Sequence, residues 1–154
     1  MRPKAEMLNL FPPLRRLKYV RVYTDGAIRP EKGVSGLAAV VRDESGQIRH
    51  WWSRRAGRMT CNEAEYAAVI LALESLRPMQ PQEVHVYSDS QVVVQQMRGL
   101  ATARAPAMRQ AQARLRALIV QFEQVTFHHV PREQNRLADA LANEVLDGKR
   151  GFDG

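Results

Sequence analysis

Four acidic residues stand where they could act together on metal ions. Asp25 and Asp89 end two stretches of the same pattern, VRVYTD and VHVYSD. Glu65 lies on the apolar stripe of a predicted helix, and Asp139 lies in the first turn of another. Oxygen ligands without a Cys or His cluster select Mg²⁺ or Mn²⁺ rather than zinc. Two such ions about 4 Å apart support in-line cleavage of phosphodiesters.

Each acid also has an ordinary structural interpretation. A strand-end aspartate often begins a turn, and an acid in the first turn of a helix is favoured by the helix dipole. Four carboxylates gathered at one sheet end would nevertheless repel one another, since each pair about 4 Å apart costs about 4 kcal/mol at an effective dielectric near 20. A cluster of this kind therefore requires cations.

The elements that must position these acids follow from periodicity and turn residues. The predicted strands are 20–24, 37–42, 47–54, 84–88 and 125–130. The predicted helices are 62–76, 90–100, 108–122 and a last one that begins after Asn135 as its N-cap and stops at Gly148. This order predicts an α/β fold with a five-stranded mixed sheet, three antiparallel strands and then two parallel ones, with helices on its faces.

The same order predicts that Asp25 and Asp89 are neighbours. A right-handed crossover through helix 62–76 would place strand 84–88 parallel to strand 20–24. Neighbouring strands lie about 4.8 Å apart, and open α/β sheets bind ligands at the carboxyl ends of their strands.

Composition sets the class of partner. The chain has 154 residues and a net charge of +7, which suits one domain and favours polyanions. Residues 91–122 contain no acid but five arginines, which indicate a solvated face or phosphate contacts: Arg98, Arg104, Arg109, Arg114 and Arg116.

The single Cys61 forms no intrachain disulfide, so we expect a reducing cytoplasm. The longest apolar run, 67–73, is too short to span a membrane.

Four motifs together resemble a known family. They are YTDG at 23–26, TCNEAEY at 60–66, YSDSQ at 87–91 and HVPREQNRLADALA at 129–142. In this order they are similar to the motifs of type 1 ribonuclease H, over about residues 19–147. The resemblance implies the RNase H-like fold, preceded by an N-terminal lead-in (1–18) and followed by a C-terminal tail (148–154). The chain resembles the branch that lacks the basic protrusion.

The resemblance implies a site and a reaction. Asp25, Glu65, Asp89 and Asp139 would bind two Mg²⁺ ions, with Mn²⁺ as a substitute, and the scissile phosphate. The substrate would be the RNA strand of an RNA–DNA hybrid, cut to leave 5′-phosphate and 3′-hydroxyl ends. His129 matches a mobile histidine that assists proton transfer or product release, although it could be a strand-end histidine without a catalytic part.

The resemblance also implies substrate contacts. Asn62 and Gln91 match contacts to the minor groove, where 2′-hydroxyls distinguish RNA from DNA. Gly26 would allow the backbone to approach the RNA, and Thr60 with Asn62 matches a pocket for a DNA-strand phosphate. Thr60 could equally be only a helix N-cap. Cys61 departs from the family, which commonly has a second Asn there, and we expect its thiol to be a small packed side chain.

Two other functions stay open from the residues alone. The chain could be a hybrid-binding module without turnover, or a nuclease of the same superfold that cuts another substrate, of the transposase or resolvase type, since fold does not fix substrate. In each case we expect a monomer that binds nucleic acid and no membrane.

Overall fold

A computed structural model describes residues 17–147 of the chain. The five strands are β1 (Tyr19–Arg29), β2 (Val34–Arg42), β3 (Ile48–Ala56), β4 (Glu83–Ser88) and β5 (Gln124–His129). The helices are α2 (Cys61–Leu76), α3 (Gln91–Met97), α4 (Pro106–Ile119) and α5 (Arg136–Leu146), with short 3-10 turns at Pro30–Lys32, Arg77–Met79 and Arg132–Gln134. The predicted tail (148–154) and residues 1–16 of the predicted lead-in lie outside the described residues. Leu17 and Lys18 are the part of the lead-in that the structure describes.

The strands form one mixed sheet in the order β3-β2-β1-β4-β5. β1 pairs antiparallel with β2, and β2 with β3, whereas β4 is parallel to both β1 and β5. The predicted fold class and element order are therefore confirmed. In the parallel pair Tyr23 lies beside Tyr87, so the two matching stretches end side by side as predicted.

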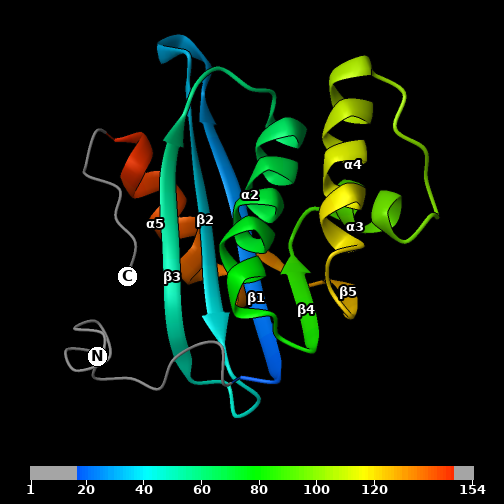
Figure 1. Cartoon of the computed structure of the whole chain (residues 1–154). Helices are drawn as coiled ribbons and strands as arrows, with labels where there is room; N and C mark the ends of the chain where they lie inside the picture. Colours follow the sequence, from blue (N-terminus) through cyan, green and yellow to red (C-terminus); the bar gives the residue numbers. More distant parts are fainter. Residues whose placement is uncertain (1–16, 148–154) are drawn as a thin grey trace, which may run out of the picture.

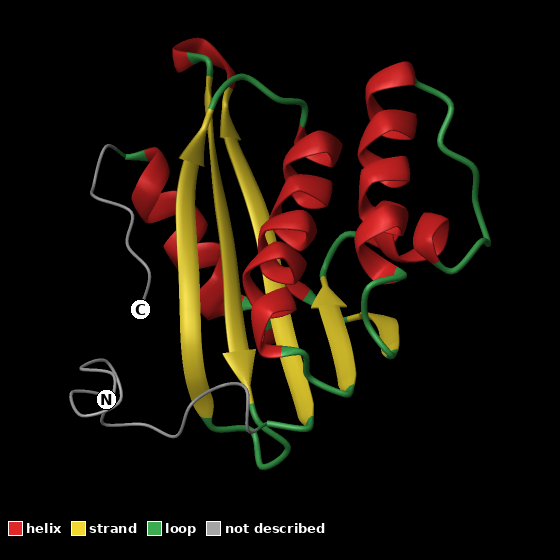
Figure 2. Ribbon diagram, viewed as in Figure 1, coloured by secondary structure: helices red, strands yellow, loops and turns green. Residues whose placement is uncertain are grey.

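Helices cover both faces of the sheet (Figure 1). α2 packs on β1 and β2 from one side and contacts α4, while α5 packs on β1, β2 and β3 from the other. Figure 2 shows the same layers, with α2 in front of the strands and α5 behind them. The core between α2 and the sheet contains the fully buried Val20, Val22, Tyr66, Leu73 and Leu76.

Two glycines let the helices approach the sheet closely. A Cβ at Gly26 of β1 would collide with the backbone carbonyl of Ala64 in α2, and a Cβ at Gly36 of β2 would collide with that of Ala142 in α5. The predicted strand 20–24 ends before Gly26, which is wrong: β1 continues to Arg29 because β2 pairs with it from Arg21 to Arg29. Gly26 thus permits packing rather than a turn.

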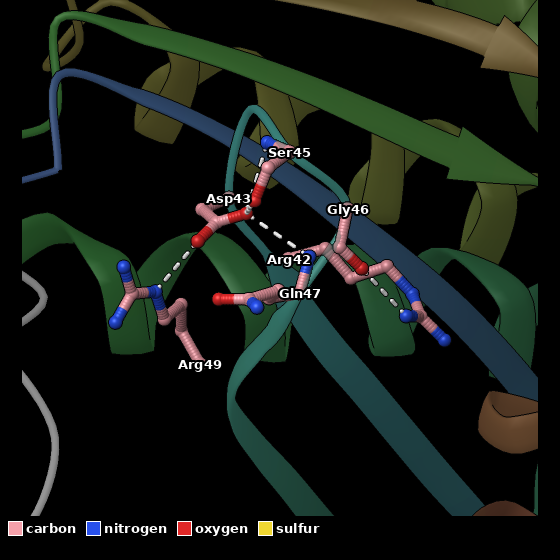
Figure 3. Close-up of polar contacts among 6 residues, drawn as sticks. All are labelled: Arg42, Asp43, Ser45, Gly46, Gln47 and Arg49. Carbon is pink, nitrogen blue, oxygen red and sulfur yellow. Dashed lines mark hydrogen bonds and ion pairs between the residues drawn. The ribbon is translucent and has the colours of Figure 1, made fainter.

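The β2–β3 hairpin is closed by an aspartate (Figure 3). Asp43 accepts hydrogen bonds from the backbone N–H of Ser45 and of Gln47, each at 3.0 Å, and from the Ser45 hydroxyl at 2.7 Å. The Arg49 guanidinium donates to its second oxygen at 2.8 Å. These donors hold the pKa of Asp43 down to about 2, with the Ser45 bonds the largest cause.

Two predicted helices have different bounds in the structure, and one predicted cap differs in its hydrogen bonding. Helix 90–100 is only Gln91–Met97, because Gly99 takes a left-handed conformation with φ of 77°. Helix 108–122 is shifted to Pro106–Ile119, since Pro106 suits the first turn of a helix. Asn135 stands at the N-cap position of α5, but its side chain makes no capping hydrogen bond.

Candidate metal and phosphodiester site

Three of the predicted acids meet at the carboxyl ends of β1 and β4. Asp25, Glu65 and Asp89 each offer a carboxylate oxygen, and these oxygens all lie within 4.8 Å of one another. Asp25 and Glu65 are buried, with 5% and 8% of their surfaces exposed, and Asp89 is half-buried. Asp139, the fourth predicted acid, is near enough to Asp25 to raise the pKa of that carboxyl, but it is not one of the three whose oxygens meet within 4.8 Å. The structure therefore brings three of the four predicted acids together, and their role as metal ligands stays a prediction.

Asp25 and Glu65 reach this point from opposite faces of the sheet. Asp25 follows Tyr23 on the face that α5 covers, whereas Glu65 belongs to α2 on the other face. Gly26 lets α2 come close enough for the Glu65 Oε1 to accept a hydrogen bond from the Gly26 N–H at 2.8 Å. The missing side chain at residue 26 thus brings the two carboxylates together.

Within residues 17–147, no cationic side chain pairs with the acids of this cluster. Burial first, and then the neighbouring carboxyl groups of Glu65, Asp139 and Asp89, together raise the pKa of Asp25 to about 9. Burial also raises the pKa of Glu65 to about 7, although the Gly26 N–H opposes that change. No ion pair of the described residues involves Asp25, Glu65 or Asp89.

This donor set fits hard divalent cations. All the converging ligands are carboxylate oxygens, the kind that Mg²⁺ and Mn²⁺ prefer. A cation there would remove the repulsion that raises both pKa values and would return the acids to their ionised form. The described residues contain no other group of three His, Cys, Asp or Glu side chains that could hold an ion.

Asn135 joins the helix that carries Asp139 to the strand that carries Asp25. Its Nδ2 donates to the Thr24 carbonyl at 2.8 Å, and the residue is 2% exposed. The next turn of α5 then holds Asp139, whose carbonyl and carboxylate both accept from Asn143. Asn135 is the N-cap residue of α5, as predicted, but its side-chain amide fixes α5 against β1 instead of capping the helix.

The predicted substrate residues lie at nearby helix ends. Thr60 is the N-cap of α2 in a reciprocal capping box with Glu63, so its alternative interpretation as a helix cap is confirmed. Asn62 and Gln91 are exposed in the first turns of α2 and α3. His129 is exposed at the end of β5, beside Ser88.

The structure also bears on two other predictions, the packing of Cys61 and the role of the five arginines of 91–122. Cys61 is exposed at the start of α2 rather than packed, because the first turn of that helix projects beyond the core. Three of the five arginines of 91–122 have partners within the fold: Arg98 donates to the Phe127 carbonyl, Arg116 to that of Gln96, and Arg114 pairs with Glu74. Arg104 and Arg109 are exposed.

Sequence reasoning missed a row of stacked side chains on the α5 side of the sheet. The rings of Tyr23 and Tyr87 stack at 4.8 Å between centroids, and the ring of His128 stacks on Tyr87 at the same distance. The alternation of Tyr19, Arg21 and Tyr23 with buried residues along β1 is the signal that could have revealed this row.

Comparison with known proteins agrees with this geometry. Residues 23–145 match a family model described as reverse transcriptase-like. Ribonuclease HI of Halobacterium salinarum is 38% identical over 83% of this chain, and a bifunctional protein of Mycobacterium tuberculosis is 35% identical over 83%. The chain spans 64% of the length of the first relative and 35% of the second.

Solved structures give the same picture. The crystal structure of RNase H1 from Halobacterium salinarum superposes with a TM-score of 0.80 at 37% identity, covering 84% of this chain and 98% of that one. An RNase H1 crystallised in complex with an RNA/DNA hybrid superposes with a TM-score of 0.79 at 35% identity, covering 84% and 97%. No described helix is long and apolar enough to cross a lipid bilayer.

Proposed function

The chain belongs to the ribonuclease H family, and we propose from this that it is an endoribonuclease that hydrolyses the RNA strand of RNA–DNA hybrids. The observation that supports the proposal most is the convergence of Asp25, Glu65 and Asp89 within 4.8 Å without a cationic partner among the described residues. The proposal also rests on relatives named ribonuclease H and on one related enzyme crystallised with a hybrid.

In the proposed site Asp25, Glu65, Asp89 and Asp139 hold two Mg²⁺ ions. Bound there, the ions would lower the pKa of a coordinated water and stabilise the charge that develops on the leaving oxygen. The chain's own part is to fix the geometry: the Gly26 N–H orients Glu65, and the Asn135 amide fixes the helix that presents Asp139. His129, exposed beside the cluster's strand end, would take up or release a proton.

Selectivity for a hybrid would come from the helix ends around the cluster. Asn62 and Gln91 are exposed and can reach a minor groove, where the 2′-hydroxyl marks RNA. Thr60 and Asn62 stand at the start of α2, where the helix dipole favours a phosphate of the DNA strand. Gly26 would admit the RNA backbone, in addition to admitting α2.

A panel of three labelled substrates tests the proposal: an RNA–DNA hybrid, duplex RNA and duplex DNA, each with Mg²⁺ or with a chelator. We expect cleavage of the RNA strand of the hybrid alone, with 5′-phosphate ends, and no cleavage by Glu65→Gln or without metal. Tight hybrid binding without turnover would instead support a binding module. Cleavage of duplex DNA would support a nuclease of the transposase or resolvase type.

A further inference from the structure

The α5 side of the sheet carries a polar, aromatic surface that the proposed reaction does not use. Its side chains are half-buried, and they alternate with core residues along β1 and β4. We call it the tyrosine–histidine face, and it consists of Tyr19, Arg21, Tyr23, Arg42, His85, Tyr87 and His128.

The rings of this face stack across β1, β4 and β5, and Arg42 of β2 extends the row. The Arg42 guanidinium lies 5.7 Å from the centroid of the Tyr23 ring, which stacks on Tyr87, which in turn stacks on His128. A second row begins with Arg21, which lies 5.7 Å from the Tyr19 ring centroid. Because the rings stack on one another, they carry little conformational entropy to lose when a ligand binds.

Histidine and glutamate complete the second row. Tyr19 lies against His85 with 4.8 Å between ring centroids. One ring nitrogen of His85 lies 2.8 Å from a ring nitrogen of His128, and the other lies 2.8 Å from Glu83 Oε1. Glu83 is therefore already paired within the face.

The charge of the face favours an anion. Arg21 and Arg42 stand on it, and the exposed Arg136 lines a pocket of about 260 Å³ between Tyr23, Arg42 and the start of α5. Glu133 is the one acidic residue among those that line this pocket. The N-terminal segment 1–16, with four basic residues and one acid, has the same sign of charge and does not complement the face.

The face leads directly to the acidic cluster. Tyr23 precedes Asp25 by two residues on the same side of β1, which corresponds to about 6.6 Å along a strand. Tyr87 of β4 likewise precedes Asp89, which directly follows that strand, by two residues. A strand of nucleic acid that passes the cluster would meet Tyr23, Tyr87 and the guanidinium of Arg42 next.

We propose that the tyrosine–histidine face binds the phosphodiester backbone of single-stranded nucleic acid. Arg21 and Arg42 contact phosphates, and the tyrosine hydroxyls donate to phosphate and sugar oxygens, while the histidine rings hold the tyrosines in place. Basic side chains interleaved with aromatic rings are how proteins hold single strands without reading their sequence. Only the path from the face into the cluster rests on the proposed function, because single-strand binding itself requires no hydrolysis.

The test measures binding of a fluorescent oligodeoxythymidylate of about 12 nucleotides to the full chain by anisotropy, with EDTA present. We expect the double variant Arg21→Gln/Arg42→Gln to bind roughly tenfold more weakly and to lower the slope of log affinity against log salt by about 1.4, or about 0.7 for each lost phosphate contact. The matched control Arg54→Gln/Arg55→Gln removes the same charge from exposed positions of β3 and should bind as the parent does.

Three results would overturn the proposal. The parent could fail to bind the single strand, the control could lose as much affinity as the face variant, or duplex DNA could bind equally well and be equally sensitive to Arg21 and Arg42. The variant Arg21→Lys/Arg42→Lys, which keeps the charge, should retain most of the affinity and separates lost contacts from misfolding. Hybrid cleavage with Mg²⁺ reports separately on the proposed function, so the two can fail independently.

Discussion

Two aspartates buried to the same extent have opposite electrostatic environments. Asp25 is 5% exposed and has a pKa raised to about 9, whereas Asp43 is 7% exposed and has a pKa lowered to about 2. Asp43 accepts from Ser45, Gln47 and Arg49 in its hairpin, while Asp25 faces other carboxyl groups. Desolvation is the largest cause of the raised pKa of Asp25, and the neighbouring carboxyl groups add to it, whereas at Asp43 the hydrogen-bond donors outweigh desolvation. A buried acid that lacks hydrogen-bond donors around it indicates a site for an external ligand such as a cation. A buried acid whose oxygens accept several hydrogen bonds indicates a structural role, here in a turn.

The largest expected effect of this contrast is on activity. Asp25→Asn removes a ligand that the fold does not otherwise use, so hybrid cleavage should fall by roughly 10³-fold or more. Asp43→Asn should leave the rate with Mg²⁺ within about twofold, because Asp43 lies in the hairpin between β2 and β3, remote from the cluster in sequence and topology. If both variants lost hybrid cleavage to the same extent, the different pKa values of Asp25 and Asp43 would not distinguish a functional acid from a structural one.

The second effect is on the pH dependence of stability without metal. A carboxyl whose pKa is raised by folding stabilises the protein fully below its unfolded pKa, near 4, and loses that contribution as the pH rises towards the folded value. The metal-free protein should therefore unfold more easily at pH 8 than at pH 5. At pH 8 the Asp25→Asn variant should be more stable than the parent protein, by on the order of 2–4 kcal/mol in free energy of unfolding.

Metal supplies the control for that measurement. Mg²⁺ should raise the melting temperature of the parent at pH 8, because it binds the folded state only, and should do so far less for Asp25→Asn. A parent whose melting temperature is insensitive to both Mg²⁺ and pH between 5 and 8 would contradict the assignment of these acids to a cation site.

The acids of the cluster, unlike Asp43, could be predicted from the sequence, and the reason lies in local pattern and strand topology. The matching stretches before Asp25 and Asp89 are strands because alternating branched residues suit a sheet, and a parallel pair must bring their ends together. Glu65 and Asp139 were placed by helical periodicity. The convergence of the acids therefore followed from pattern and topology without any knowledge of side-chain contacts.

Other features depend on contacts that no local pattern encodes. Gly26 resembles a turn residue after an aspartate, yet its function in the fold is to make room for Ala64 of a helix some forty residues later. Asn135 resembles a cap, yet its amide bonds the Thr24 carbonyl across the sheet. The tyrosine–histidine face likewise becomes visible only when the strand order places β1 between β2 and β4.

The third effect concerns the glycine that brings Glu65 to Asp25. Gly26→Ala forces a methyl group against the Ala64 carbonyl and the Glu65 N–H, so α2 must move away from β1. We expect a loss of about 1–3 kcal/mol in free energy of unfolding. Hybrid cleavage should fall by about tenfold or more as well, because displacing one ligand by about 1 Å is enough to impair a reaction. Unfolding in urea and initial rates of hybrid cleavage measure the two losses.

Gly57→Ala is the matched control for that substitution. Gly57 has open space where its Cβ would lie and does not have a positive φ, so the alanine should change neither quantity appreciably. A Gly26→Ala protein that is destabilised but cleaves at the parental rate would show that α2 can shift without disturbing Glu65.

The smallest effect is on the aspartate that the fold satisfies. Asp43→Asn keeps the shape of the hairpin but removes the charge that accepts from Arg49 at 2.8 Å, which should cost about 1–2 kcal/mol of unfolding free energy at pH 7. Because folding lowers the pKa of Asp43, its contribution is present above 3.8 and disappears as the pH falls towards 2. Urea unfolding of parent and variant should therefore converge in acid, and at pH 7 the parent should be the more stable protein, whereas the parent should be less stable than Asp25→Asn at pH 8. If the difference in unfolding free energy between the parent and Asp43→Asn grew as the pH fell, the neighbours of Asp43 would not be stabilising its ionised form.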